Sequence, residues 1–317
     1  MGHEVRIFYR DDTEAIRKLY NRIRYGRRKN WLDDFNGESY AYNHLVAHSF
    51  AQDELILSMC ARTTFDACSL PENVGIKVLH CHGAEIENWD YMVKSWKLKI
   101  PKIVVSTHLI DQIKQETGEE VMGVAPDGVD TSEYFSCIPY DKRNAIGGVV
   151  RWSPSKSPET TVEIFRKLHE SIPDANLVSY GADKKANLDF VSFTRNPSVS
   201  KAREIYSSCR IWFLASKHEG FGLPVLEAMA CGCVVVSTNC GGPSDIIKDG
   251  VNGFIVDVGD ADAMVAKIKG LWADAELLQQ MSINAIETAK RFTWQAGAEK
   301  LEGYLQEIYT NATPKKF

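Results

Sequence analysis

Hydrophobic positions in the second half of the chain follow two alternating periods. From about residue 145 onward, short apolar runs rich in β-branched residues are followed by stretches in which apolar residues recur every three or four positions. The runs predict strands at residues 145–152, 175–181, 210–216 and 234–238, and the stretches between them predict helices at residues 157–172, 200–209 and 223–232. Ser157 is expected to cap the first of these helices. Strands that alternate with helices in this way are typical of a doubly wound α/β domain with a parallel sheet.

The first half of the chain shows the same alternation in a less regular form. Strand patterns occur at residues 3–10, 54–60, 76–82 and 101–107, and a helical pattern occupies residues 106–117. They predict a second Rossmann-like domain that ends near residues 125–135. A last helical pattern, at residues 294–310, either packs on its own domain or crosses to the other one. We therefore expect an α/β protein whose two Rossmann-like domains face each other across a cleft, divided as residues 1–140, residues 141–295 and a terminal helix within residues 296–317.

The composition restricts the classes of function. The chain has 317 residues, of which 44% are hydrophobic and 25% charged, so it is long enough for two domains with separate cores. Its net charge of −5 gives no general attraction to nucleic acid. The 8 cysteines are scattered, without a CxxC pair or metal-ligand spacing, and predict reduced thiols of a cytoplasmic protein. No apolar run reaches membrane-spanning length, and residues 1–30 carry charges rather than the apolar core of a signal peptide.

The stretch HEGFGLPVLE, residues 218–227, carries the most specific chemical pattern. It follows a predicted strand, so its loop lies at the carboxyl edge of the parallel sheet, where open α/β folds bind their ligands. Gly220 and Gly222 let a ligand or another backbone approach closely, and the helix that begins near Pro224 offers free N–H groups to a phosphate. Glu219 and Glu227 flank this turn, and carboxylates accept hydrogen bonds from vicinal hydroxyls. This order favours a nucleotide sugar as ligand; the alternative is that Glu227 only stabilises its helix through the macrodipole.

Residues 215–256 strongly resemble the donor-binding region of the GT-B glycosyltransferases of family GT4, including their E-x7-E motif. The resemblance extends to RWSPSK, where Arg151 and Lys156 match an Arg and a Lys of the family, and to VLHCHGAE with its His-Gly pair. It also includes APDGVDT, in which Asp127 replaces the usual Asn. In total it covers about residues 50–310. It implies a GT-B fold, with residues 1–140 as the acceptor domain and residues 141–295 as the donor domain.

The resemblance implies a role for each matching residue. Arg151 and Lys156 would hold the donor diphosphate, so that neither a metal ion nor another cofactor is needed; otherwise they form a solvated pair at a strand end. Glu227 would bind the ribose hydroxyls, and Glu219 would lie beside the transferred sugar. His82 would approach that sugar from the opposite domain, with His80 as a competitor on the same strand face. Backbone groups near the sugar and phosphates would come from Gly220, Phe221, Gly222 and Leu223.

Two parts of the chain depart from the family pattern. GHEV follows Met1 directly, where the family has a strand, a glycine-rich turn and a helix before it, so we expect an incomplete N-terminal domain. Either the protein starts upstream, or a partner completes the fold, or activity has been lost. Residues 16–31 carry seven Lys or Arg residues among apolar residues at helical spacing. This pattern fits either a contact with a membrane surface or a core-facing helix with a solvated basic face.

The resemblance implies a metal-independent glycosyltransferase that retains the anomeric configuration. Its partners would be a nucleoside-diphosphate sugar as donor and a carbohydrate, lipid-linked or other acceptor, in the cytoplasm or at the membrane periphery. Residues 192–200 are expected to be a loop that contributes to base and sugar selectivity. The alternative is a non-catalytic nucleotide-sugar-binding subunit or scaffold of a two-chain glycosyltransferase. A Rossmann oxidoreductase is disfavoured because no G-x-G-x-x-G turn follows a strand.

Overall fold

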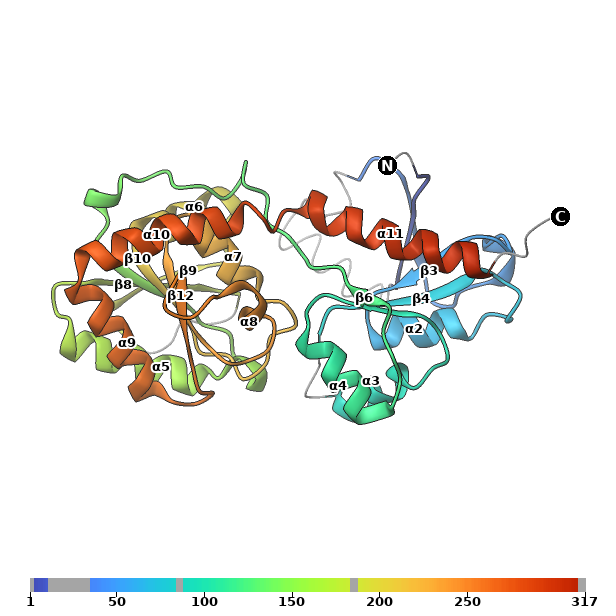
Figure 1. Ribbon diagram of the computed structural model, residues 1–317, viewed down its shortest axis with the longest axis horizontal. Helices are drawn as coiled ribbons and strands as arrows, with labels where there is room; N and C mark the ends of the chain where they lie inside the picture. Colours follow the sequence, from blue (N-terminus) through green and yellow to red (C-terminus); the bar gives the residue numbers. More distant parts are fainter. Residues whose placement is uncertain (1–2, 11–34, 84–87, 183–187, 313–317) are drawn as a thin grey trace, which may run out of the picture.

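The computed structural model describes residues 3–10, 35–83, 88–182 and 188–312. The basic segment 16–31, for which a membrane contact is one of the two interpretations, lies outside these residues. Figure 1 shows two α/β lobes side by side, with the terminal helix running from one lobe across to the other. Within the described residues, no helix combines the length and the apolar character needed to cross a membrane.

The C-terminal lobe is built on one six-stranded sheet in which all neighbouring strands are parallel. In spatial order its strands are β12 (Gly253–Val256), β11 (Val234–Thr238), β10 (Cys209–Leu214), β7 (Ala145–Val149), β8 (Asn176–Gly181) and β9 (Val191–Arg195). The first strand along the chain, β7, is central, and the chain winds outward to β9 before it returns to β10 beside β7. This is the doubly wound order, and its switch point falls between β7 and β10.

Both faces of this sheet are covered by helices. Successive side chains of a strand point to opposite faces, so Ile211 and Phe213 join one core while Trp212 joins the other. The first core contains residues of α5 (Pro158–Ser171) and α9 (Ala261–Ala273), and the second contains residues of α6 (Val199–Ser208), α7 (Leu223–Ala230) and the short α8 (Pro243–Ile246). The helix α10 (Ala275–Ala289) packs against α7 and α9 and contributes to both cores. The strands are therefore buried on both sides, which explains their continuous apolar runs.

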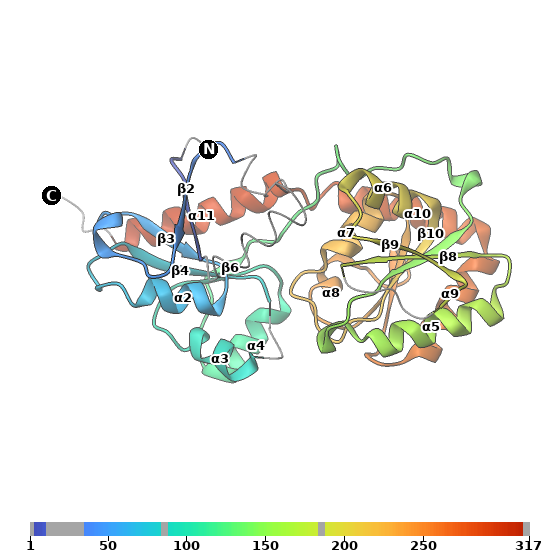
Figure 2. The same cartoon turned by 180° about the vertical axis from the view of Figure 1, so that it is seen from behind.

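The N-terminal lobe contains a smaller parallel sheet. Its strands are β3 (Leu55–Ser58), β4 (Ile76–Cys81), β5 (Lys102–Val104) and β6 (Gly123–Val124). One face is covered by α2 (Ala61–Cys68), α3 (Trp89–Trp96) and α4 (His108–Thr117), and the other by α11 (Trp294–Ala312) (Figure 2). Ile308 of α11 shares a core with Val78 and Ile103. The terminal helix thus crosses from its own lobe to the N-terminal sheet.

The first two strands form a sheet of their own. Strand β1 (Arg6–Arg10) pairs in parallel with β2 (Glu38–Tyr42), and among the described residues neither strand pairs with the four-stranded sheet. Polar contacts tie this small sheet to α2: Arg10 Nη1 donates to both carboxylate oxygens of Asp66 at 2.8 and 2.9 Å, and the Tyr42 hydroxyl donates to Asp66 at 2.9 Å. The strands of the N-terminal lobe are therefore divided between two sheets.

Three local expectations need correction. The segment predicted as a selectivity loop at residues 192–200 is mostly the edge strand β9 and the start of α6, because the alternating Val191–Arg195 pattern favours a strand despite the turn residues that follow. Ser157 precedes α5, but its φ of 43° places the hydroxyl where it makes no capping hydrogen bond. Strands β2, β6 and β12 were not predicted. The described residues also include the 3-10 helices η2 (Ala47–Ser49), η4 (Tyr140–Lys142) and η5 (Pro154–Lys156).

Candidate functional site

A cavity of about 430 Å³ lies where the carboxyl ends of strands from both sheets meet. Of the nine residues predicted as site residues, eight line it, and Glu227 is the exception. Its C-terminal wall comes from the segments after β7 and β10, the two strands at the switch point. Its N-terminal wall comes from the segments after β3 and β4, from α3 and from the loop after β6. The doubly wound order brings these segments together, because loops on either side of a switch point diverge and leave a crevice between them.

Lys156 and Glu219 form the polar centre of the C-terminal wall. Lys156 is the last residue of η5, and its Nζ lies 2.8 Å from Oε1 of Glu219, with both side chains largely buried. The Ser216 hydroxyl donates to the same carboxylate oxygen at 2.7 Å, and Lys156 Nζ also donates to the carbonyl of His218 at 3.3 Å. Arg151, which is exposed, lines the same cavity just beyond β7. Two cationic groups and one carboxylate therefore face the space in which a ligand would bind.

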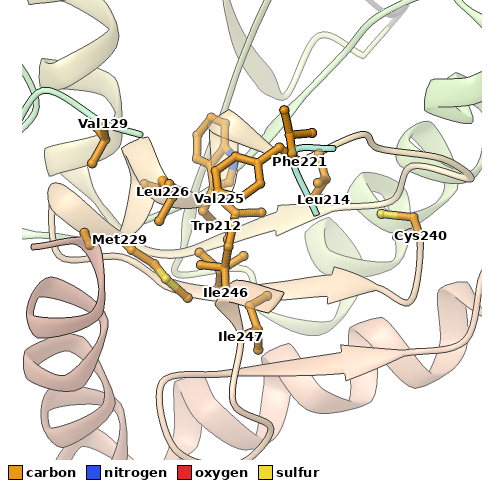
Figure 3. Packing of buried hydrophobic residues seen from close by; sticks show 14 of the residues in the cluster. Val129, Trp212, Leu214, Phe221, Val225, Leu226, Met229, Cys240, Ile246 and Ile247 are labelled. Carbon is orange, nitrogen blue, oxygen red and sulfur yellow. The ribbon is translucent and has the colours of Figure 1, made fainter. Parts of the chain in front are cut away.

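The glycine turn after Glu219 is shaped by the opposite lobe. A Cβ atom on Gly220 would lie 1.8 Å from the carbonyl oxygen of His82 and 2.9 Å from the Cα of Gly83. Gly222 has a φ of +99°, a conformation that favours glycine. Between them the Phe221 ring is buried beside Trp212 and Val225, as Figure 3 shows, and anchors the turn to the core. The absence of a side chain at Gly220 thus lets the backbone of His82 and Gly83 approach closely.

Helix α7 begins at the edge of the cavity. Gly222 is its N-cap, Pro224 lies in its first turn, and Gly222, Leu223 and Pro224 all line the cavity. The first N–H groups of a helix have no partner within the helix, and the dipole makes this end positive. A phosphate at this end of the cavity would find both features.

Glu227 lies one turn further along α7, beside a cluster of tyrosines. The Tyr206 hydroxyl donates to Glu227 Oε2 at 2.8 Å, Tyr134 hydrogen-bonds to the same carboxyl group, and the hydroxyls of Tyr180 and Tyr206 contact each other. Burial raises the pKa of Glu227, whereas the hydrogen bonds from Tyr206 and Tyr134 act to lower it. These contacts hold the carboxyl group in one orientation. Its predicted contact with ribose stays a prediction.

The structure brings the competing histidines His80 and His82 into direct contact. His82 Nε2 lies 3.1 Å from His80 Nδ1, and His82 Nδ1 lies 3.3 Å from Asp127 Oδ1. His80 is buried, while His82 and Asp127 line the cavity. Sequence reasoning noted Asp127 only as a departure from the family pattern. Asp127 is separated from His82 by several strands and helices, so a local sequence pattern cannot reveal that the two residues are partners.

Further contacts join the lobes beside the cavity. The Ser106 hydroxyl donates to the carbonyl of Gly220, and the Thr107 backbone N–H donates to Asp245 Oδ2 at 2.7 Å. Ser106 and Thr107 precede α4, and Asp245 belongs to α8. None of these residues belongs to a motif that is recognisable in the sequence. Met59 and Cys60 line the N-terminal wall of the cavity and were not predicted, although their position directly after β3 is a usable signal.

Two parallel α/β sheets that face one cavity with their carboxyl ends define the GT-B architecture, and comparisons with known proteins agree with it. The family model described as Glycosyl transferases group 1 matches residues 135–288. The match includes residues 215–256, where the sequence resembles glycosyltransferases.

Individual relatives show the same relationship. The chain is 38% identical over 171 residues to the D-inositol 3-phosphate glycosyltransferase of Corynebacterium diphtheriae, covering 49% of this chain and 40% of the relative. It is 29% identical over 212 residues to the enzyme of that name from Stackebrandtia nassauensis, covering 57% and 47%. The chain thus spans less than half the length of either relative. Among solved structures, Anabaena Alr3699/HepE in complex with UDP-glucose superposes with a TM-score of 0.74 at 16% identity, covering 95% of this chain and 91% of that one. This structural likeness confirms the fold.

Proposed function

We propose that this protein is a metal-independent glycosyltransferase that transfers a sugar from a nucleoside-diphosphate sugar to an acceptor with retention of anomeric configuration. One observation carries the proposal. Arg151, Lys156 and Glu219 meet at the switch point of the C-terminal sheet, in one cavity with the N-terminus of α7 and with His82 of the opposite lobe. We further propose that residues 141–295 form the donor domain, residues 1–140 the acceptor domain, and residues 296–317 include the helix that crosses back.

The charges of the site suit a diphosphate. Lys156 is paired with Glu219 in the structure, so an incoming phosphate would compete with this carboxylate for the ammonium group. Arg151 adds a second positive charge, and the free N–H groups of α7 add donors without a charged side chain. Together they would stabilise the negative charge that develops as the nucleoside diphosphate leaves. This supply of positive charge supports a transfer that needs no metal ion.

The reaction would then proceed on one face of the sugar. The bond between the anomeric carbon and the donor phosphate oxygen breaks, and the acceptor oxygen forms its new bond on the same face. A phosphate oxygen of the leaving diphosphate takes the proton of the acceptor hydroxyl. Glu219 would lie beside the sugar, and Glu227, oriented by Tyr206 and Tyr134, would accept hydrogen bonds from the ribose.

The solved neighbours suggest where to begin with the donor and acceptor. The Anabaena structure holds UDP-glucose, so uridine nucleotides are the first to test as donor. The acceptor, a carbohydrate, a lipid-linked molecule or another hydroxyl compound, would lie against the N-terminal wall, which includes Met59 and Cys60. All eight cysteines are free thiols, which supports a cytoplasmic site of action, with or without membrane-peripheral contact.

A second function has one observation in its favour. The division of the described N-terminal strands into two sheets suits a subunit that binds a nucleotide sugar while another chain contributes to the acceptor side. Such a scaffold would bind the donor without transferring its sugar. Turnover by the purified chain therefore separates the two proposals.

Nucleotide binding tests the site directly. When nucleoside diphosphates and nucleotide sugars of different bases are tested, we expect those of one base to raise the melting temperature of the protein. A ligand at a hundredfold excess over Kd stabilises the folded state by about 2.7 kcal/mol. The shift should persist with a chelator, and a shift that disappears would contradict metal independence. Proton NMR of the anomeric position in the product then reports retention or inversion.

A pair of lysine variants locates the nucleotide. Lys156→Ala removes a charged hydrogen-bond donor, so the Kd for the nucleotide should rise roughly 10- to 100-fold. Lys217→Ala, an exposed lysine of the neighbouring loop that does not line the cavity, is the matched control and should bind like the wild type. Wild-type affinity in Lys156→Ala would place the nucleotide elsewhere.

A further inference from the structure

The glycine turn after Glu219 lies between main-chain segments of both lobes. On one side, a Cβ atom on Gly220 would lie 1.8 Å from the His82 carbonyl oxygen of the N-terminal lobe. On the other side, a Cβ atom on Gly242 would lie 2.6 Å from the Gly220 carbonyl oxygen. The loop that contains Gly242 is also hydrogen-bonded to the turn: Glu219 N–H donates to the Cys240 carbonyl at 2.7 Å, and Gly242 N–H donates to the Glu219 carbonyl at 3.2 Å. The turn is therefore held by contacts of its main chain.

A serine of the N-terminal lobe contacts the same turn. Ser106 lies between β5 and α4, it is fully buried, and its hydroxyl donates to the Gly220 carbonyl. His108 Nδ1 lies within hydrogen-bond distance of Ser106 Oγ, at 2.9 Å. A serine hydroxyl has one hydrogen and a carbonyl oxygen only accepts, so the hydrogen of Ser106 belongs to the bond with Gly220. His108 Nδ1 must then carry a hydrogen and donate it to Ser106.

The two residues after Ser106 also reach the C-terminal lobe. The Thr107 backbone N–H donates to Asp245 Oδ2 at 2.7 Å, and this carboxylate lies at the N-terminus of α4, where the positive end of the helix dipole favours a negative charge. His108 Nε2 lies so close to the loop after β11 that a Cβ atom on Gly241 would approach it to 2.6 Å. Three consecutive residues thus dock on the glycine turn and on the loop that is hydrogen-bonded to it.

We propose that Ser106 is a positioning residue for the donor side of the cavity, although it belongs to the opposite lobe. By holding the Gly220 carbonyl, it fixes the glycine turn in its ligand-facing position, and His108 orients the Ser106 hydroxyl. The inference rests on the proposed function for its catalytic meaning, because that function places the donor sugar and phosphates beside the turn. The donor site is then complete only while the lobes are in contact. A ligand that binds the fixed turn must in return strengthen the contact between the lobes.

Nitrogen NMR of the histidine rings tests the direction of this hydrogen-bond chain without any substrate. Burial lowers the pKa of His108 below the ordinary value of 6.5, so its ring is neutral at pH 8 and carries one hydrogen. With histidine labelled by 15N and the His108 signals assigned by their loss in His108→Gln, we expect this hydrogen on Nδ1. A hydrogen on Nε2 instead would mean that Ser106 donates to His108 and not to Gly220, and it would overturn the proposal. This measurement uses the wild type, so it decides even if a Ser106 variant fails to fold.

A matched pair of serine variants tests whether Ser106 holds the turn. Ser106→Ala and Ser58→Ala each remove one buried hydroxyl that donates to a main-chain carbonyl, but the Ser58 bond, to Val78 at 3.0 Å, stays within the N-terminal lobe. Amide hydrogen exchange at Glu219 and Gly242 should be about tenfold faster in Ser106→Ala, as the loss of one hydrogen bond implies, and unchanged in Ser58→Ala. Wild-type exchange at both amides in a folded Ser106→Ala protein would contradict the proposal.

Turnover separates the positioning role from the proposed function. With UDP-glucose as the donor probe, Ser106→Ala should lower kcat for the release of UDP roughly tenfold and change the Kd for UDP much less, because a misplaced turn affects the reacting sugar more than the bound nucleotide. Ser58→Ala should keep the wild-type kcat, and an equal loss in both variants would show a merely structural effect and overturn the proposal.

The failures of the two proposals are distinguishable. A wild type that shows the expected His108 hydrogen and the expected exchange, but turns over no nucleotide sugar, would support the fixed turn and refute the proposed function. A wild type that turns over UDP-glucose, together with a folded Ser106→Ala protein that does so at the same rate, would refute this inference and keep the proposed function.

Discussion

The region 145–289 and the region 55–124 are built from the same kinds of element but differ in how completely their sheets are formed. In the region 145–289, six parallel strands form one sheet with a core on each face. In the region 55–124 the sheet has four strands, the last with only two residues, and one of its faces is covered by a helix from the far end of the chain. The first region therefore closes both faces of its sheet with its own helices, whereas the second needs α11 to cover one face of its sheet.

This difference shows in the site residues of each wall. Lys156 and Glu219 follow strands that are central in a complete sheet, and they contact each other directly. His82 follows a strand too, but its orientation depends on Asp127 and its backbone lies against Gly220 of the other lobe. We therefore expect Lys156 and Glu219 to keep their positions even when the two lobes separate. We expect the position of His82 to depend on the contact between the lobes.

Breaking that contact should have the largest effect. Gly220→Ala would place a methyl group 1.8 Å from the His82 carbonyl oxygen, so the lobes must move apart. Because displacements of about 1 Å at a reacting centre cost on the order of 10²-fold, we expect kcat/KM for transfer to fall roughly 10²-fold, with the nucleotide Kd changed much less. Steady-state kinetics and nucleotide titration measure the two quantities separately.

A second glycine serves as the control for this substitution. Gly270 of α9 has open space where a Cβ would lie, so Gly270→Ala adds the same methyl group to the same region without a collision. It should transfer sugar at the wild-type rate. If Gly220→Ala also kept the wild-type rate, the two backbones would not meet in the active state, and the comparison between the regions would fail.

The pH dependence of stability should sharpen the comparison from the N-terminal side. Burial lowers the pKa of His80 to about 4, below the ordinary value of 6.5. Between these values the unfolded chain binds more protons than the folded one, so the free energy of unfolding rises with pH across this window. The contribution of His80 is present above pH 6.5 and is lost as the pH falls toward 4, by roughly 3 kcal/mol in full.

Urea unfolding at several pH values can isolate this contribution. The wild type should lose stability between pH 6.5 and pH 4 more steeply than His80→Gln, because glutamine does not titrate. His44→Gln replaces an exposed histidine and should unfold with the wild-type pH dependence. Equal slopes for the wild type and His80→Gln would show that His80 is not held neutral in the folded protein.

The smallest effects test whether the two regions unfold separately. Gly270 in α9 and Gly303 in α11 both have open space at the Cβ position, and alanine in a helix interior is more stable than glycine by about 0.5–1 kcal/mol. Each substitution should therefore stabilise the region on which its helix packs. Calorimetry should show Gly270→Ala raising the transition of the region 145–289 and Gly303→Ala raising that of the region 55–124. A single transition raised equally by both would show that the regions unfold together.

Local pattern was sufficient where a functional side chain directly follows a strand or begins a helix. Glu219 was predicted for this reason, since the carboxyl ends of parallel strands must share one edge, whereas Arg151 and Lys156 were predicted from the resemblance to a family. Glu227 of α7 was predicted as a site residue, but the pattern did not predict that it lies away from the cavity wall. Its surroundings include Tyr134, Tyr180 and Tyr206, which come from other parts of the chain. The pattern also mistook β9 for a loop, since an edge strand carries polar turn residues close behind it.

The sequence by itself determined the α/β class, most of the alternating strands and helices between residues 145 and 238, and the place of Glu219 and its glycine turn at the carboxyl edge of the C-terminal sheet. These features depend on periodicity and on neighbours within a few residues, which a linear pattern records. Only the tertiary structure decided that α11 covers the N-terminal sheet, that Gly220 makes room for the His82 backbone, and that Asp127 and His80 hold the ring of His82. Each of these contacts joins segments that are separated by other strands or helices, and it exists only because the packed sheets bring those segments together.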